Sequence, residues 1–268
     1  ATEAQIVALM VGRDVADLFP QVPHQPGEAL LVVQGMSGPH IPSDVTFQLR
    51  RGEILGLSGL VGAGRTEMLR CLFGLDAVVS GEVRVAGRCP ANTPAARIRA
   101  GLALVSEDRK GEGLAQDRSI ADNMTLTALA SYSRAGWLNL ARRDVAVRQW
   151  MAKVQVKARG PDQPVRELSG GNQQKVAIAR VLHQGADVLL LDEPTRGIDV
   201  ATKAEIYRLI GELAAAGKAV IFVSSYLPEL MAVCDRIGVM TRGRLREIRS
   251  TRDWTEETVM ACAVAAEG

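Results

Sequence analysis

The sequence has few aromatic residues, few histidines and no cysteine spacing typical of a metal site. Of its 268 residues, 4% are aromatic and 3 are histidine. The four cysteines lie far apart, which indicates neither a disulfide framework nor a metal cluster and predicts reduced thiols in a cytosolic protein (Cys71, Cys89, Cys234 and Cys262). A net charge of +2 lacks the basic excess of nucleic-acid-binding proteins, so we expect no nucleic-acid partner. No apolar run approaches the roughly 20 residues that span a bilayer.

What the chain does contain suits one sizeable α/β domain. Hydrophobic residues make up 47% of it, enough for a buried core. Residues 1–26 differ, because a short apolar stretch at Ile6–Val11 leads into a proline-containing segment that includes Phe19 and Pro20. We expect residues 1–26 to be the end of a preceding domain with its linker, and residues 27–268 to be the domain itself.

Alternating strand and helix patterns predict a mostly parallel sheet with an antiparallel β layer near the start. The predicted strands are Val45–Leu49, Ile54–Ser58, Glu82–Val85, Leu102–Val105, Val188–Leu191, Ala219–Val223 and a hairpin of Gly238–Met240 with Leu245–Ile248. The predicted helices are Thr66–Phe73, Ala95–Ala100, Ser119–Ala130, Ala141–Val154, Gln173–Leu182, Ala201–Ala215 and Thr255–Ala265. A small helical subdomain is expected at about residues 108–167.

Three motifs carry chemistry, and the first is a glycine-rich turn between a strand and a helix. The segment Gly59–Thr66 (GLVGAGRT) fits the P-loop frame, whose backbone N–H groups curl around phosphates. Thr66 would offer its hydroxyl to Mg²⁺. The position of the usual lysine holds Arg65. Without that lysine, an ordinary tight turn is an equal interpretation of this segment taken alone.

The second motif is an apolar strand that ends in two carboxylates. Val188–Leu191 is followed by Asp192 and Glu193. This is the Walker B arrangement, in which Asp192 would bind Mg²⁺ and Glu193 would polarise the attacking water. Standing alone, it would be better interpreted as a core strand that reaches a loop.

The third motif is Leu168–Lys175 (LSGGNQQK), ahead of an apolar-periodic helix. Ser169 is a good N-cap, and the glycines let the backbone approach an anion at the positive end of the helix. A flexible helix cap is the ordinary interpretation. The three motifs in this order in one chain make coincidence a poor explanation.

The chain resembles the ABC-type ATPases, and over its whole length it is similar to the C-terminal half of the tandem ATPase of bacterial monosaccharide importers. The resemblance rests on the phrases GLVGAGRTE, VSEDRKGEG, LSGGNQQK, LDEPTRGID and VSSYLPE, and on Met10–Arg13, which resembles that family's inter-domain linker. It implies a P-loop ATPase core with an antiparallel β subdomain and a small helical subdomain. The implied cofactors are ATP and Mg²⁺, and the transported sugar would be of the ribose, galactose, xylose or arabinose type.

The resemblance also implies roles for individual residues. The nucleotide-binding positions are Gly59, Gly62, Ala63, Gly64, Arg65, Thr66, Glu67 and, at the lid position that usually holds glutamine, Glu107. Thr66 and Asp192 would hold Mg²⁺, Glu193 is the catalytic position, and Ser225 stands where the switch histidine is usual. The residues that would face a partner domain's ATP are Ser169, Gly170, Gly171 and Asn172, with Asp199 in the loop that crosses to that domain.

Two departures from the family pattern predict an asymmetric pair of sites. Arginine is a planar fork where lysine is a compact charge, and a serine lacks the imidazole cation. Losing one well-placed donor typically lowers a rate by about 10²–10³. We therefore expect Arg65 and Ser225 to make this P-loop a weak site, while the signature completes a competent site in the preceding domain.

The partners implied by the resemblance are the preceding nucleotide-binding domain, transmembrane permease subunits and, indirectly, a periplasmic sugar-binding protein. The protein would then lie peripherally on the cytoplasmic face of the bacterial inner membrane and contact the permease near Glu107–Leu114, a charged stretch that is otherwise an ordinary solvated loop. A nucleoside importer half and a regulatory nucleotide-binding domain with little turnover remain as alternatives. A soluble ATPase acting on nucleic acid or ribosomes is disfavoured, since Glu67–Glu167 has no sustained heptads and residues 1–26 form no basic helical linker.

Overall fold

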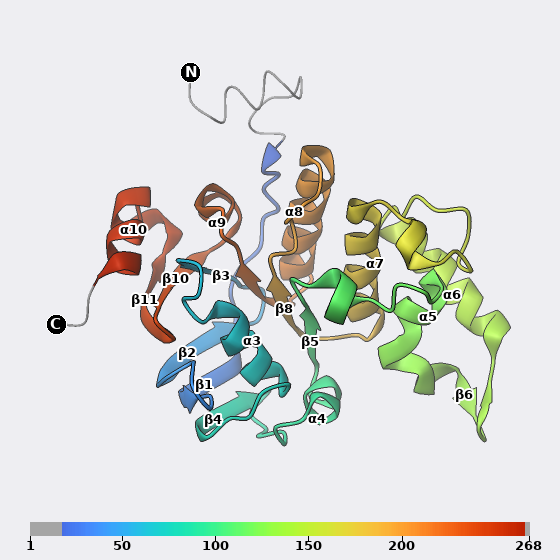
Figure 1. The fold of residues 1–268 in the computed structure, drawn as a ribbon, viewed down its shortest axis with the longest axis horizontal. Coiled ribbons are helices and arrows are strands. Elements are labelled where there is room, and N and C mark those ends of the chain that lie inside the picture. Colours follow the sequence, from blue (N-terminus) through green and yellow to red (C-terminus); the bar gives the residue numbers. More distant parts are fainter. Residues whose placement is uncertain (1–17, 266–268) are drawn as a thin grey trace.

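A six-stranded sheet forms the centre of the fold, and a three-stranded antiparallel sheet packs beside it (Figure 1). The structure, a computed structural model, describes residues 18–265. The six-stranded order is β11-β10-β3-β9-β8-β5, parallel except for the β10–β11 hairpin, and the smaller sheet runs β2-β1-β4. The strands of these two sheets are β1 (Ala29–Ser37), β2 (Val45–Arg50), β3 (Ile54–Gly59), β4 (Ser80–Val85), β5 (Leu102–Val105), β8 (Val188–Asp192), β9 (Ala219–Val223), β10 (Arg236–Thr241) and β11 (Arg244–Ser250).

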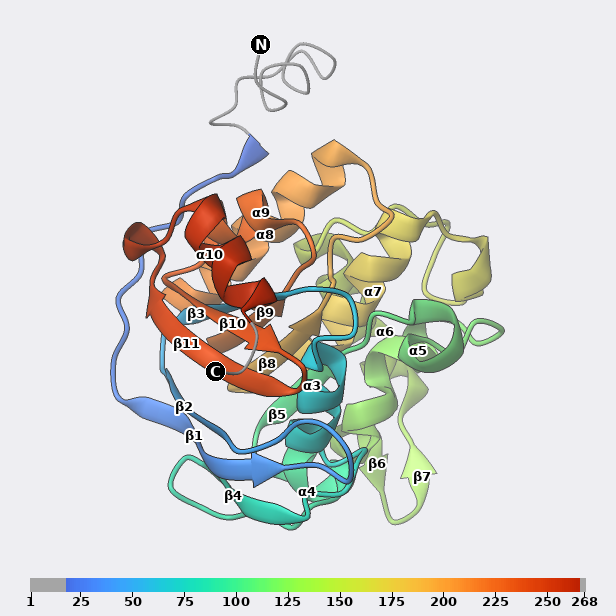
Figure 2. The same ribbon diagram turned by 60° about the vertical axis from the view of Figure 1, so that its left-hand side comes forward.

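The central strands β3, β9 and β8 are apolar except for Ser58 and Asp192 at their carboxyl ends, because the sheet is covered on both faces. Alternate residues of one strand enter two different cores: Val220 and Phe222 of β9 join one, and Ala219, Ile221 and Val223 join the other. The first core lies against α7, α8 and α9, and the second lies against α3 and the small sheet. Figure 2 shows the small sheet and α3 together on one side of the central sheet.

Six of the seven predicted helices are present at about the predicted positions, α5 is shorter than predicted, and α9 was not predicted. They are α3 (Arg65–Phe73), α4 (Pro94–Arg99), α5 (Ile120–Thr125), α6 (Leu140–Lys153), α7 (Gly170–His183), α8 (Val200–Ala215), α9 (Leu227–Val233) and α10 (Glu256–Val264), with short turns η1 (Arg109–Gly113), η2 (Leu126–Tyr132), η3 (Val165–Glu167) and η4 (Thr251–Asp253). Thr93 and Ser169 cap α4 and α7 with their side chains, and Gly74 follows α3 at φ 83°. The predicted cap at Ser169 and the predicted end of α3 at Phe73 are thus confirmed, while α7 begins three residues before the predicted Gln173. Within residues 18–265, no helix is both long and apolar enough to cross a membrane.

The segment between η1 and η3 lies to one side of the central sheet (Figure 1). The predicted helix over Ser119–Ala130 is wrong beyond Thr125, because the chain continues as the 3-10 turn η2 and leaves helical geometry at Ala128 (φ −130°). A two-residue hairpin, β6 (Ser133–Arg134) with β7 (Trp137–Leu138), follows and was not predicted. Such short strands give too few residues for an alternating pattern.

The start of the described chain packs along the core. The ring of Phe19 stacks on Tyr207 of α8 with centroids 5.3 Å apart, and His24 bonds to Asp235. The expectation that residues 1–26 hold a domain end and linker falls mostly on residues 1–17, which lie outside the described residues.

Candidate functional site

Three functional segments come together at one edge of the central sheet. β3, β9 and β8 are parallel neighbours in that order, and the carboxyl ends of parallel neighbours share an edge. The segments that leave this edge, residues 59–66, 224–226 and 192–199, contain the P-loop, the switch position and the two Walker B acids. Because β9 is the middle strand, Ser224 and Ser225 lie between the P-loop and the acids.

The glycines of the P-loop are needed for two different reasons. A Cβ on Gly59 would lie 2.5 Å from the carbonyl oxygen of Met240, and one on Gly64 would lie 2.9 Å from Cα of Gly243, so both permit close packing. Gly62 has φ 78°, and a Cβ there would meet nothing within 4 Å. Glycine at position 62 is therefore needed for its left-handed backbone conformation, and it leaves open space above the loop, next to the buried Ala63.

The start of α3 offers backbone donors to that space. Gly64 is the N-cap and supplies no side-chain hydrogen bond, so the first N–H groups of α3 keep their capacity to bind an anion. Glu67 lies in the first turn of α3, and its negative charge raises the pKa of Asp192 in addition to the larger effect of burial. The loop tip is exposed, with Val61 97% accessible.

Asp192 is a buried carboxylate with one oxygen left over. Its side chain is bonded to the Thr66 hydroxyl, and its Oδ1 is buried without a hydrogen-bond partner. Burial raises the pKa of Asp192 to about 6. A hydroxyl and a carboxylate oxygen are ligands that Mg²⁺ accepts in nucleotide sites, so this donor pair fits the ion.

Glu193 lies beside Asp192 in a left-handed backbone conformation, with φ 47°. The backbone N–H and hydroxyl of Ser225 donate to its carboxylate, while burial, the larger effect, raises the pKa of Glu193. A carboxylate with a raised pKa is a better proton acceptor at neutral pH than an exposed one. The left-handed conformation is costly for a residue with a Cβ and is found at functional sites, where neighbours hold it.

The side chain of Arg65 extends from the P-loop to residues 224–226, the segment that follows β9. Its Nη1 donates to the carbonyl oxygen of Ser224 at 3.0 Å. Its positive charge also lowers the pKa values of Asp192 and Glu193, against the larger effect of burial. In this structure the arginine thus bonds to the segment that contains Ser225.

Glu107 and the charges after it line an open cleft beside the P-loop helix. Glu107 forms an ion pair with Arg196, and Arg109 donates to the carbonyl oxygens of Gly170 at 2.7 Å and Arg196 at 3.3 Å. The cleft is lined by Thr66, Arg70, Ser106, Glu107, Asp108, Arg109, Lys110, Glu112, Arg196 and Gly197. Neither interpretation of this charged stretch anticipated that Arg109 bonds to the signature helix, since nothing in the local sequence names a partner 61 residues away.

The signature segment is held by α8 and not by this chain's own P-loop. The Oγ of Ser169 accepts hydrogen bonds from Asn172 N and Nδ2, at 3.5 and 2.9 Å. A Cβ on Gly171 would lie 3.0 Å from Thr202 of α8, so glycine permits this close approach. Figure 1 shows α7 beside α8 and apart from α3.

Asp199 is the N-cap of α8. Its carboxylate accepts from the backbone N–H and the hydroxyl of Thr202, at 3.0 and 2.7 Å. These bonds lower its pKa and give Asp199 a structural role within its own chain.

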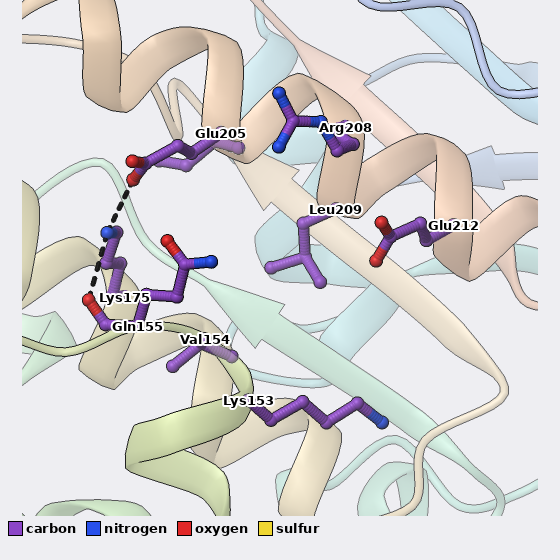
Figure 3. A pocket seen from close by; sticks show the side chains of 9 residues that line it. Lys153, Val154, Gln155, Lys175, Glu205, Arg208, Leu209 and Glu212 are labelled. Carbon is purple, nitrogen blue, oxygen red and sulfur yellow. Dashed lines mark hydrogen bonds and ion pairs between the residues drawn. The ribbon is translucent and has the colours of Figure 1, made fainter.

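Lys175, the last residue of the signature phrase, lies in α7, and its side chain is buried and points toward Glu205 of α8 (Figure 3). Its Nζ donates to the Gln155 carbonyl at 3.1 Å and pairs with Glu205 at 2.5 Å. It thereby ties the chain after α6 to α8 at the back of the signature helix. No local pattern predicts this contact, because the partners lie 20 and 30 residues away.

Comparison with known proteins identifies relatives over almost the whole chain. A family model described as ABC transporter matches residues 42–196. A putative ribose/galactose/methyl galactoside import ATP-binding protein of Agrobacterium fabrum is 45% identical over 99% of this chain and 54% of that protein. A ribose import ATP-binding protein of Streptomyces coelicolor is 48% identical over 98% of this chain and 52% of that protein. The chain therefore spans about half the length of the curated relatives it matches.

Solved structures agree on the fold. A nucleotide-free ATP-binding cassette from an ABC transporter superposes with a TM-score of 0.74 at 16% identity, over 89% of this chain and 100% of that one. The predicted fold class is thus confirmed.

The open space at Gly62 predicts a loss of nucleotide binding in Gly62→Ala. Gly87 is a matched control, because it also has a positive φ (75°) and open space at its Cβ, but lies in the turn after β4. Both variants should lose roughly 1–2 kcal/mol of stability, since both force a Cβ into a left-handed conformation. Titration with a fluorescent ATP analogue and Mg²⁺ should show at least a tenfold weaker affinity for Gly62→Ala alone. Equal affinities for the two variants would contradict a phosphate site at this loop.

The raised pKa of Asp192 predicts that Asp192→Asn stabilises the metal-free protein at high pH. The carboxyl is protonated in both states below pH 4, whereas above pH 6 the folded state holds a poorly solvated anion. Its shift from 3.8 to about 6 corresponds to about 3 kcal/mol of unfolding free energy, present above pH 6 and absent below pH 4. Urea unfolding with EDTA should show the full gain at pH 8 and a smaller gain at pH 5, which lies between the two pKa values. Asp187→Asn, which removes a 2.8 Å ion pair with Lys218, is the control and should give no gain.

Proposed function

Since the chain belongs to the ABC transporter family, we propose that it is the second nucleotide-binding domain of the ATPase subunit of a bacterial monosaccharide importer. The observation that carries the proposal is the convergence of the glycine loop, Asp192 and Glu193 at one sheet edge. Its sugar class is supported by relatives named as ribose and galactose import ATP-binding proteins. Their double length supports a preceding domain in the same polypeptide.

In the proposed reaction, the chain binds ATP and orients water for attack on the γ-phosphate. The N–H groups of the P-loop and of α3 would bind the phosphates, and Thr66 and Asp192 would hold Mg²⁺. When bound, Mg²⁺ supplies positive charge that neutralises the phosphate oxygens. Glu193, bonded to Ser225, would orient the water and accept its proton at a carboxylate oxygen.

We propose further that this P-loop is the weaker of two sites. Arg65 is bonded to the Ser224 carbonyl, so its guanidinium must leave that acceptor before it can bind phosphate. Ser225 supplies a neutral hydroxyl where a cation is usual. In contrast, Ser169, Gly170, Gly171 and Asn172 form a well-capped helix start that the preceding domain's ATP would meet. Asp199, at the start of α8, would face the same domain.

The permease would contact the groove between the core and the segment that follows η1. The groove beside Glu107–Leu114 is largely apolar, and it is lined by Arg70, Phe73, Leu75, Ile98, Leu104, Ser106, Glu112, Gly113, Thr127, Arg180, Val181 and Gln184. A cytoplasmic-face, peripheral location and an indirect link to a periplasmic sugar-binding protein follow from this proposal. We divide the chain at residue 26, with the helical subdomain at about 108–167.

A regulatory domain with little turnover is the second candidate, favoured by the contact between Arg65 and Ser224. A nucleoside importer half differs from the first proposal only in the transported compound.

Mg-ATP binding and turnover by this chain, its Arg65→Lys variant and its Glu193→Gln variant distinguish the two functions. We expect weak binding and slow turnover by the wild type, because Arg65 is engaged elsewhere. Arg65→Lys should bind at least tenfold more tightly, and Glu193→Gln should abolish the turnover while binding is kept. Fast, Glu193-dependent turnover by the wild type would show that arginine replaces lysine fully, and turnover at background in all three would favour the regulatory role.

Ser169→Arg in the full-length ATPase should remove most activity, because the side chain would block the helix start that faces the partner's ATP. Ser119→Arg is the matched control, since Ser119 also caps a helix with its side chain, here α5, and its loss costs about 1 kcal/mol. Steady-state hydrolysis should fall at least 100-fold in Ser169→Arg and less than threefold in Ser119→Arg or Arg65→Ala. If Arg65→Ala were as damaging as Ser169→Arg, the asymmetry would be wrong.

A further inference from the structure

Glu229 is a fully buried carboxylate that none of the sequence motifs explained. It lies in α9 with 1% of its surface accessible. Three hydroxyls donate to it: Thr195 at 2.8 Å, Ser224 and Tyr207. An ionised carboxylate only accepts hydrogen bonds, so three hydroxyl donors match it well.

Two of these donors lie in the segments that contain Glu193 and Ser225. Thr195 follows Glu193 by two residues, and Ser224 directly precedes Ser225. The Oγ of Ser224 also accepts from the backbone N–H of Tyr226 at 2.9 Å, so the backbone on both sides of Ser225 is fixed. One carboxylate therefore joins the two segments whose side chains meet in the hydrogen bond between Ser225 and Glu193.

The backbone at Glu193 needs such support. Its φ of 47° is unfavourable for a residue with a Cβ and persists only where surrounding contacts fix it. The carbonyl oxygen of Glu193 accepts from Arg196 N at 3.1 Å, which forms a turn around Thr195. The hydroxyl of Thr195 attaches that turn to Glu229.

The same network extends to the P-loop. Arg65 donates to the carbonyl oxygen of Ser224, whose hydroxyl donates to Glu229. Ser224 and Glu229 thus connect Arg65 of the P-loop to residues 224–226 and to residues 193–198.

We infer that Glu229 is the positioning residue that holds the Glu193 carboxylate against Ser225 by joining residues 193–198 to residues 224–226. This inference rests on the proposed function, in which Glu193 orients water. Glu229 touches neither nucleotide nor water in this role, and it acts only through the two segments that it joins.

Hydrogen exchange measured by mass spectrometry tests whether Glu229 holds the two segments together, and it requires no ATP turnover. Glu229→Gln keeps the size of the side chain but replaces one acceptor oxygen with a donor. Thr195→Val removes the hydroxyl donor while it keeps the shape of the side chain. Both should speed exchange at least tenfold in peptides that cover residues 193–198, and Glu229→Gln also in those that cover 224–226. Tyr207→Phe removes the donor that belongs to neither segment and should leave both unchanged.

Glu53→Gln is the control for loss of a buried carboxylate. Glu53 is also 1% accessible, but it pairs with Arg236 at 2.5 Å, away from the three segments. Unchanged exchange in Glu229→Gln, or the same increase in Glu53→Gln, would overturn the inference. If Glu229→Gln does not fold, the comparison of Thr195→Val with Tyr207→Phe decides instead: equal exchange over residues 193–198 in these two variants would overturn the inference.

Single-turnover hydrolysis with enzyme in excess supplies the chemical readout. Displacing a reacting group by about 1 Å lowers rates roughly 10²-fold, so Glu229→Gln should slow the step by roughly that factor while the affinity for Mg-ATP stays within about twofold. Glu193→Gln should slow the step at least as much as Glu229→Gln does, because Glu229 acts only through Glu193. A slower reaction in Glu229→Gln than in Glu193→Gln would contradict positioning. Wild-type hydrolysis at background would instead refute the hydrolytic part of the proposed function, and the exchange result would still decide the role of Glu229.

Discussion

The parallel arrangement of β3, β9 and β8 is the constraint on which the rest of the site depends. Parallel hydrogen bonding brings the three carboxyl ends to one edge, and the strand order determines which of the three following segments lies in the middle. The phosphate loop and the two acids are placed on either side of Ser224 and Ser225 because β9 is the middle strand. Two separate cores hold the three strands in register, one on each face of the sheet. The chemistry of the edge therefore depends on packing many residues away.

The edge concentrates features that lower stability. Asp192 is buried with an orphan oxygen, and Glu193 has a left-handed backbone. Neither feature helps the fold, and both suit a site that binds a cation and orients water. The structure offsets them locally through hydroxyl groups: Thr66 bonds to Asp192, Ser225 bonds to Glu193, and Thr195 bonds to Glu229. Hydroxyls give hydrogen bonds without adding charge to a region that already holds several carboxylates.

The signature helix belongs to a second surface, separate from the P-loop of the same chain. It packs on α8 through Gly171 and Lys175, and Arg109 connects its first turn to the loop after the acids. That loop also ends in Asp199, the cap of α8. A movement of residues 192–199 would thus be transmitted by Arg109 to the start of α7. Arg109 therefore connects the two surfaces, which under the proposed function would serve different nucleotides.

The sequence by itself determined most of the elements and the positions of the motifs at their ends, but not the β6–β7 hairpin or α9. Ser169 as a cap, Gly74 as a stop and the buried strands Leu102–Val105 and Ala219–Val223 follow from local rules of capping and hydrophobic pattern, which depend on neighbours in the chain. Only the tertiary structure decided which side chains meet. Arg65 reaches Ser224, 159 residues away, and Glu229 binds Thr195, 34 residues away. Such contacts are set by strand order and helix packing, and no local pattern in the sequence specifies them.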